Sequence, residues 1–213
     1  MIVTTAKTPS NRGRRLPPEI LTSAEVSALL KACSKRAPTG IRNRALITVL
    51  YRGQLRVSEA LALMPSNIDL EAGTLRVLHG KGNKARTVGL DDGALAVLQL
   101  WLMRRRELGL GSRHPVFCTL QGNPLKDSYC RALLSRLAAK AKIDKRVHPH
   151  GLRHTGAAEM RSEGIDIGII SKQLGHSSIA TTARYLDHIS PTAVVEAMRA
   201  RKWQSPEGRV RRG

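Results

Sequence analysis

The stretch GLRHTGAAEMRSEGIDIGIISKQLGHSSIATTARYLD, residues 151–187, decides the fold class. It predicts three consecutive helices, of which the first two end near Gly164 and Gly175. Glycine commonly follows the last turn of a helix, because it adopts a left-handed conformation without a steric penalty. This end of the chain is therefore predicted to be a closely spaced series of helices.

The middle of the chain has a different pattern. Residues 74–79 (TLRVLH) and 86–90 (RTVGL) are predicted strands, and the turn Gly80-Lys81-Gly82-Asn83 between them indicates a hairpin. Thr22 and Glu25 fit a capping box at the start of a first helix. Further helices are predicted over about 41–52, 56–64, 92–108, 126–141 and 191–203. The predicted fold class is mainly α with a small antiparallel β-sheet (α+β).

The composition predicts one compact unit with a tail at each end. Hydrophobic residues make up 41% of the 213 residues, which is enough for a core, and the 3% of aromatic residues imply that this core is mostly aliphatic. Residues 1–20 are predicted to be a flexible basic N-terminal arm, and residues 204–213 a disordered basic tail. Residues 21–203 are predicted to form a single domain.

The charge points to a polyanionic partner. Lys and Arg number 36 against 16 Asp and Glu, a formal net charge of +20. Such a domain repels itself unless a polyanion offsets the charge, and nucleic acid is the leading candidate because bound cations release its condensed counterions. An anionic membrane surface is the weaker alternative. No apolar stretch of about 18 residues and no signal peptide is present, so we expect a cytoplasmic protein.

The cysteines predict no cofactor. Cys33, Cys118 and Cys130 are odd in number and show no CxxC spacing, which argues against a zinc site or a disulfide framework. We expect reduced thiols, no bound metal and no cofactor.

Four short motifs contain the side chains that metal-free phosphodiester transfer needs. They are RVSEAL with Arg56, the hairpin tip HGKGNK with Lys81, HPHGLRH with His150 and Arg153, and LGHSSIATTARY with His176 and Tyr185. A tyrosine phenol, with a pKa of about 10, can both attack a phosphate and leave it again. Arginine forks bind the non-bridging oxygens, a lysine can protonate the leaving oxygen, and a histidine can move a proton near neutral pH.

In this order and spacing the four motifs resemble those of the tyrosine recombinases, the integrase and Xer-type family. The resemblance covers about residues 20–203 and implies that 21–203 is a catalytic domain. It implies a site-specific recombinase of bacterial, phage or other mobile-element origin that acts on double-stranded DNA at the nucleoid.

The resemblance also implies a role for each residue. Arg56 and Arg153 would clamp the scissile phosphate, and Glu59 would support this clamp. Lys81 would protonate the leaving 5′-oxygen, and His150 would assist proton transfer at the tyrosine. His176 would donate a hydrogen bond to a non-bridging oxygen, and Tyr185 would be the nucleophile. The product is a 3′-phosphotyrosine link, which a second 5′-hydroxyl attacks without ATP or metal.

Two features depart from the family pattern. The spacing from Gly53 to Arg56 is one residue longer than in many members, and the helical core-binding domain of about a hundred residues is absent. The chain is therefore expected to be either a fragment or a naturally short recombinase. Self-association into a dimer or tetramer on DNA is expected through the helix at 191–203, although its apolar residues fit packing within the same chain equally well.

Other interpretations remain open at this point. The same chemistry occurs in type IB topoisomerases and telomere resolvases, and the same fold could serve a non-catalytic DNA-binding regulator. Tyr51 and Tyr129 are predicted to pack rather than react. Arg104, Arg105 and Arg106 are predicted to form the solvated face of a helix, with some backbone contact.

Overall fold

The computed structural model describes residues 19–78, 85–176, 178–186 and 199; for residues 184–186 it describes the backbone alone. The described elements follow one another as α1 (Ser23–Ala32), α2 (Pro38–Tyr51), α3 (Val57–Leu61), the 3₁₀ helix η1 (Pro65–Asn67), β1 (Ile68–Asp69), β2 (Thr74–Val77), β3 (Arg86–Gly89), α4 (Asp92–Glu107), α5 (Asp127–Lys140), α6 (Pro149–Ser162), α7 (Ile167–Leu174) and α8 (Ile179–Leu186). The predicted class, mainly α with a small antiparallel sheet, is confirmed.

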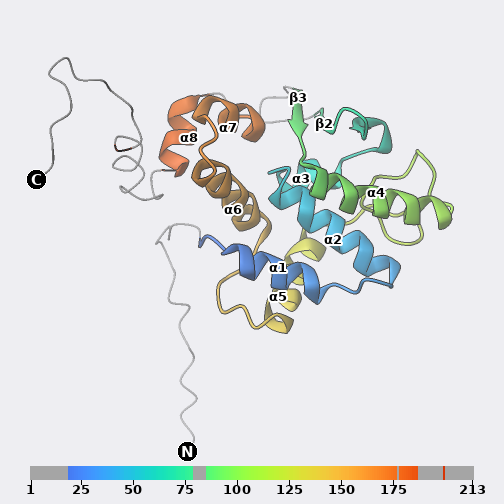
Figure 1. Cartoon of the computed structure of the whole chain (residues 1–213). Coiled ribbons are helices and arrows are strands. Elements are labelled where there is room, and N and C mark those ends of the chain that lie inside the picture. Colours follow the sequence, from blue (N-terminus) through green and yellow to red (C-terminus); the bar gives the residue numbers. More distant parts are fainter. Residues whose placement is uncertain (1–18, 79–84, 177, 187–198, 200–213) are drawn as a thin grey trace, which may run out of the picture.

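Helix α2 lies at the centre of the molecule, with α4 and α6 packed against it (Figure 1). Eleven of its fourteen residues are buried, which explains why its sequence shows little amphipathic pattern. The core around it is mostly aliphatic, as predicted, and Leu46, Leu50 and Leu98 are each no more than 1% exposed. Trp101 and Phe117 are also fully buried in this core.

The approach of α6 to α2 depends on a glycine. A Cβ atom added at Gly156 would lie 1.9 Å from the carbonyl oxygen of Tyr51 and 2.8 Å from Nε2 of Gln54. No larger residue fits this crossing without moving one helix. Gly156 therefore lets α6 bring its first turns, which include His150 and Arg153, against the end of α2.

The helix ends follow the sequence signals. The Thr22 hydroxyl accepts from the backbone N–H of Glu25, and the Glu25 carboxylate accepts from the N–H of Thr22, so the predicted capping box is present. Gly164 and Gly175 have φ values of 81° and 64°, the predicted left-handed conformation. The second helix begins at Pro38, three residues before its predicted start at Ile41.

The sheet has three antiparallel strands in the order β1-β2-β3. The predicted hairpin strands are β2 and β3, with Leu75 opposite Val88 and both side chains buried. Strand β1 was not predicted, because its two residues, Ile68 and Asp69, are too few to show an alternating pattern. The predicted hairpin tip with Lys81 lies outside the described residues.

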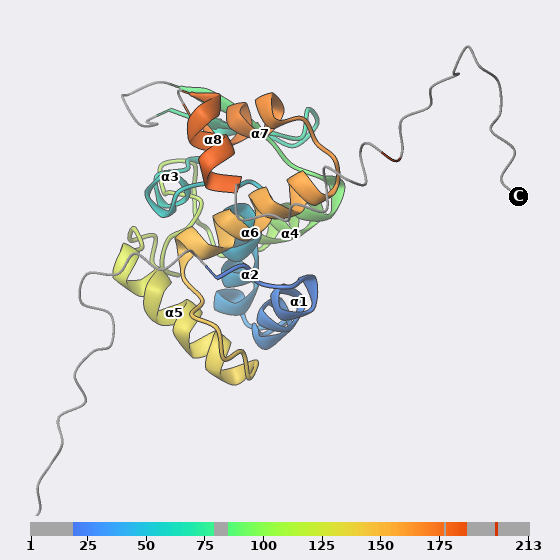
Figure 2. The same ribbon diagram turned by 90° about the vertical axis from the view of Figure 1, so that its left-hand side faces the viewer.

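Helices α7 and α8 lie together beside α6, and α7 also contacts β3 (Figures 1 and 2). On the opposite side, α1 and α5 lie next to each other (Figure 2). The upper part of the molecule in Figure 1 therefore brings together α3, β3, α6, α7 and α8, and three of the four predicted motifs, those of Arg56, Arg153 and His176, lie on or beside these helices.

The prediction for Arg105 was wrong. Its side chain is not solvated but buried, with the residue 4% exposed, and its guanidinium donates to the carbonyls of Leu110, Gly111 and Pro115. The segment after α4 folds back over the last helical turn, and its carbonyl groups need donors that water cannot supply there. Arg104 instead has a side chain that is 38% exposed and pairs with Glu107, a contact that was not predicted.

Part of what was predicted lies outside the described residues. This applies to the basic tail 204–213, to all of the helix 191–203 except residue 199, and to the arm 1–20 except its last two residues. Of those two, Glu19 accepts from the backbone N–H of Arg146, and the carbonyl of Ile20 accepts from Lys145. In the described part of the chain, no helix combines the length and the apolar character needed to cross a membrane.

Candidate active site

Glu59 forms the centre of the candidate site. Arg56 is the N-cap of α3, and Glu59 is the third residue of that helix. The Glu59 side chain is 2% exposed, and its carboxylate accepts from the backbone N–H of Arg56 at 2.8 Å and from the Arg56 guanidinium at 2.7 Å. A carboxylate at the N-terminus of a helix also interacts favourably with the helix dipole. The motif RVSE thereby fixes Arg56, whose side chain remains 31% exposed.

A second arginine, Arg86, binds the same carboxylate. Its two terminal nitrogens donate to the two oxygens of Glu59, each at 2.8 Å, and its side chain is 11% exposed. Burial alone would raise the pKa of Glu59. The hydrogen bonds from Arg86 and Arg56 outweigh it and lower this pKa to about 2. This contact of Arg86 was not predicted from the sequence, because an arginine at the start of a hairpin strand is usually a solvated residue.

Arg153 completes a group of three guanidinium groups. It is 2% exposed and donates to the carbonyl oxygen of Gln54 at 2.5 Å and to that of Leu174 at 2.6 Å. Its Nη1 also lies 3.8 Å from the Glu59 carboxylate. Three arginines around one carboxylate give this cluster a net charge of +2. Arg56, Glu59, Arg86 and Arg153 are called the arginine cluster below.

His176 follows the left-handed turn at Gly175. Its Nδ1 lies 2.9 Å from the hydroxyl oxygen of Thr182, a residue that is 0% exposed. Burial and the positive charges of Arg153 and Arg56 lower the pKa of His176 to about 4. The ring is therefore neutral at pH 7, and Thr182 determines which way it faces.

His150 lies in the first turn of α6 and is exposed at the surface. Partial enclosure of the ring lowers its pKa, and the charges of Arg153, His148 and Arg56 lower it further. The i, i+3 spacing therefore does place His150 beside Arg153. Its ring also contacts those of His148 and His154 edge to face.

The structure describes five of the seven predicted site residues with their side chains. These five lie together: Glu59 pairs with Arg56 and lies 3.8 Å from Arg153, and the charges of both arginines act on His150 and His176. Tyr185 is on α8, three residues after Thr182, and its side chain is outside the described set. Lys81 also lies outside it, although β3, which follows the hairpin tip, begins with Arg86 of the arginine cluster.

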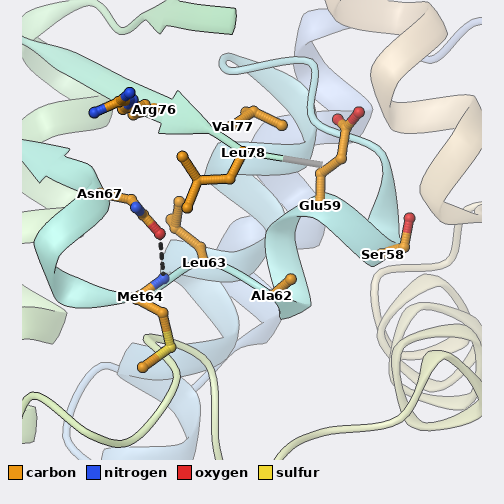
Figure 3. Close-up of a pocket in the computed structure, with 9 residues that line it drawn as sticks. All are labelled: Ser58, Glu59, Ala62, Leu63, Met64, Asn67, Arg76, Val77 and Leu78. Carbon is orange, nitrogen blue, oxygen red and sulfur yellow. Dashed lines mark hydrogen bonds between the residues drawn. The ribbon is translucent and has the colours of Figure 1, made fainter. Parts of the chain in front are cut away.

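A pocket of about 340 Å³ lies on the other side of Glu59, between α3 and β2 (Figure 3). Leu63, Val77 and Leu78 supply apolar walls, and Asn67 accepts from the backbone N–H of Met64 at 3.0 Å. None of the arginines or histidines of the candidate site lines it. Across the described ranges, no three His, Cys, Asp or Glu side chains are grouped so that they could hold a metal ion.

Comparison with known proteins agrees with this arrangement. The phage integrase family matches residues 19–190. The tyrosine recombinase XerD of Halalkalibacterium halodurans is 36% identical over 181 residues, which cover 84% of this chain and 60% of that protein. XerC of Bacillus licheniformis is also 36% identical, over 81% of this chain and 58% of the relative. The chain thus spans about 60% of the length of these relatives.

Solved structures show the same fold. The XerA recombinase superposes with a TM-score of 0.74 at 31% identity, covering 89% of this chain and 68% of that one. The XerH site-specific recombinase, bound to a palindromic difH substrate in a post-cleavage complex, gives a TM-score of 0.67 at 28% identity, covering 87% of this chain and 54% of that one. The likeness predicted from the motifs is confirmed: the chain belongs to the phage integrase family.

Proposed function

We propose that this chain is the catalytic part of a site-specific DNA recombinase, which cleaves and rejoins DNA strands through a 3′-phosphotyrosine bond to Tyr185. The observation that carries the proposal is the arginine cluster, in which buried Glu59 holds three cations in fixed positions beside the neutral His176. A fixed surplus of positive charge suits a phosphate that gains negative charge in its transition state.

Arg56 and Arg153 bind the non-bridging oxygens of the scissile phosphate. Glu59 fixes Arg56, and the carbonyls of Gln54 and Leu174 fix Arg153, so little reorganisation is needed when DNA arrives. His176 donates a hydrogen bond to a non-bridging oxygen from Nε2. The contact of Nδ1 with the Thr182 hydroxyl at 2.9 Å supports this assignment, because a neutral ring whose Nδ1 accepts from a hydroxyl carries its proton on Nε2.

The covalent step transfers the phosphoryl group to a phenol. The Tyr185 oxygen attacks phosphorus, the bond from phosphorus to the 5′-oxygen breaks, and Lys81 gives a proton to that oxygen as it leaves. His150, whose lowered pKa keeps it largely neutral, assists in removing the phenolic proton. The 5′-hydroxyl of another strand then attacks the phosphotyrosine, and the phenol leaves. Because the ester is kept throughout, no ATP is consumed.

The partner is double-stranded DNA, in the cytoplasm of a bacterial cell. The net charge of +20 supports binding through phosphate contacts, and XerH, the solved relative named above, is bound to a DNA substrate. Assembly into a dimer or tetramer on DNA, with the segment 191–203 at the interface, is part of this proposal. The proposal assigns a metal no role in the chemistry.

The test is a denaturing gel after mixing the protein with nicked or supercoiled DNA in excess EDTA. We expect a protein–DNA adduct that survives denaturation and is absent in Tyr185→Phe, which should still bind DNA. Tyr51→Phe and Tyr129→Phe are matched controls and should keep the adduct. The hydroxyl groups of both tyrosines already have hydrogen-bond partners. Tyr51 donates to the Glu159 carboxylate, and Tyr129 bonds with Arg42 and Asn43.

The proposal would be abandoned if Tyr51→Phe or Tyr129→Phe removed the adduct, or if magnesium were needed to restore it. Relaxation of supercoiled plasmid without any strand exchange would favour a topoisomerase. Binding without any adduct would favour a DNA-binding regulator.

A further inference from the structure

Arg86 makes contacts that a solvated strand residue would not need. Both of its terminal nitrogens bind Glu59, and its Nε donates to the carbonyl of Gln173 at 3.2 Å. Its side chain also packs against the turn at Gly175, since a Cβ atom added there would lie 2.7 Å from the Arg86 Cδ. One side chain thus touches α3, through Glu59, and the turn that immediately precedes His176.

The net charge of the arginine cluster depends on Arg86. Without it, buried Glu59 would face Arg56 and Arg153 alone, and the net charge of the cluster would fall from +2 to +1. A buried carboxylate that loses its bidentate partner attracts its remaining cations more strongly. Arg56 would then be held more tightly by Glu59 and would be less available to a phosphate.

Strand β3 makes a second contact with α7. The side-chain amide of Gln173 donates to the carbonyl of Gly89 at 2.9 Å and accepts from its N–H at 3.1 Å. Strand β3 therefore has contacts with α7 at both of its ends, from Arg86 and from Gly89. This second attachment would hold β3 in place when Arg86 is replaced, so the charge effect of Arg86 can be measured separately.

We propose that Arg86 is a positioning residue of the active site: it offsets the charge of Glu59, so that Arg56 and Arg153 keep their attraction for the scissile phosphate. This inference rests on the proposed function. Arg86 does not touch the reacting atoms. It acts through Glu59, so its removal should mimic a partial loss of the arginine clamp rather than a loss of the leaving-group acid.

The experiment compares Arg86→Met, Arg86→Lys and Glu59→Gln with the double variant Arg86→Met/Glu59→Gln in single-turnover cleavage. Arg86→Met should cleave about 10–10² times more slowly, less than the roughly 10²–10³ for a lost oxyanion donor, because Arg86 acts only through Glu59. Lysine keeps the charge but not the fork, so Arg86→Lys should recover only part of the rate. In the Glu59→Gln background there is no carboxylate to offset, so Arg86→Met should add little.

A substrate with sulfur in place of the bridging 5′-oxygen separates two routes of action. A thiolate leaves without a proton, so this DNA should rescue Lys81→Ala. It should not rescue Arg86→Met if Arg86 acts through the clamp. Rescue of Arg86→Met by sulfur, or additive losses in the double variant, would overturn the inference.

Arg52→Met is the matched control for stability. Arg52 pairs with Asp91 and Glu159 and is 27% exposed, but it does not touch Glu59. Its replacement should lower the melting temperature and leave the cleavage rate of the folded protein near that of the wild type. If Arg86→Met loses only as much activity as Arg52→Met, Arg86 is merely structural.

A second readout does not depend on cleavage. The charge of Arg86 contributes to the lowered pKa of His176, so the His176 titration midpoint, followed by NMR, should rise in Arg86→Met and stay unchanged in Arg52→Met. An unchanged midpoint in Arg86→Met would contradict the charge effect. If the wild type forms no adduct at all, the proposed function fails, whereas this titration still tests the influence of Arg86 on the cluster.

Discussion

Two buried or half-buried ion-pair networks lie near the end of α2, and their charges have opposite signs. In the arginine cluster, three guanidinium groups surround the single carboxylate of Glu59. In the other network, the single guanidinium of Arg52 lies within 4 Å of three carboxylates, those of Asp91, Glu159 and Glu163. The second network is called the acidic network below.

The difference separates the proposed phosphate-binding site from a structural connection. The acidic network joins the end of α2 to the N-cap of α4 and to the end of α6, and its surplus of negative charge would repel a phosphate. The arginine cluster uses the same kind of ion pair but keeps a surplus of two positive charges. The presence of ion pairs is therefore uninformative by itself, and the surplus charge indicates where an anion can bind.

The largest expected contrast is catalytic. Arg153→Ala should lower the rate of cleavage about 10²-fold or more, because a fixed donor to the transition state is lost. Arg52→Ala, in the acidic network, should leave the rate per folded molecule close to that of the wild type. Single-turnover cleavage of nicked DNA measures both. Equal losses in the two variants would mean that the two networks do not differ in function.

A substitution at the helix crossing should weaken both networks together. Gly156→Ala puts a Cβ where the Tyr51 carbonyl lies, so α6 must move away from α2. We expect the free energy of unfolding to fall by about 3 kcal/mol, at the upper end for overpacking. Chemical denaturation measures this. Gly164→Ala is a useful control, since no atom lies within 4 Å of its added Cβ, and only the left-handed backbone at φ 81° opposes the substitution.

His176, beside the arginine cluster, and Asp91, in the acidic network, should respond to different ranges of pH. The pKa of His176 is lowered to about 4, against an ordinary value of 6.5, so the folded state disfavours its protonation. Its contribution to stability is complete above about pH 6.5 and is lost as the pH falls towards 4. In the acidic network, Asp91 responds only at lower pH, because Arg52 holds its pKa below the ordinary value of 3.8.

The comparison of wild type with His176→Gln tests this separation. Between pH 6.5 and 4 the wild type should lose up to about 2 kcal/mol more stability than the variant, after allowance for solvent screening of a partly exposed ring. Urea denaturation across this range gives the difference directly. Parallel pH profiles would show that neither burial nor the arginine cluster perturbs His176.

The smallest expected effect is on the salt dependence of binding. If about six phosphates are neutralised, the logarithm of the DNA-binding constant should fall with the logarithm of salt concentration at a slope near −5. Arg56→Met removes one such contact and should reduce the magnitude of the slope by about 1. Arg52→Met should not change it. Fluorescence anisotropy at several salt concentrations distinguishes the two, and a salt-independent wild type would contradict phosphate binding.

The candidate site residues that the sequence indicated are those with short-range signals. Arg56, Arg153 and His176 stand in motifs whose residue types and spacing are unusual together, so the sequence pointed to them in spite of their separation. Arg86 has no such motif. Its importance comes from a carboxylate 27 residues earlier in the chain, and one sequence contains no signal for a pairing across that separation.

The fold shows the same division. Gly164, Gly175 and the Thr22 capping box act within a few residues, so their effects could be predicted from the sequence. The burial of Arg105 depends on a loop that folds back over α4, and the two-residue strand β1 exists because β2 lies beside it. Both depend on a neighbouring segment that the local pattern does not identify.

The sequence by itself determined the helical class, the hairpin, the strong positive charge and the set of reactive residue types, because these follow from local propensity, composition and spacing. Only the tertiary structure decided which charges surround Glu59 and which surround Arg52. The physical reason is that an ion pair depends on distance and burial in space. Residues far apart in the chain reach that distance only where the helices pack, as they do at Gly156.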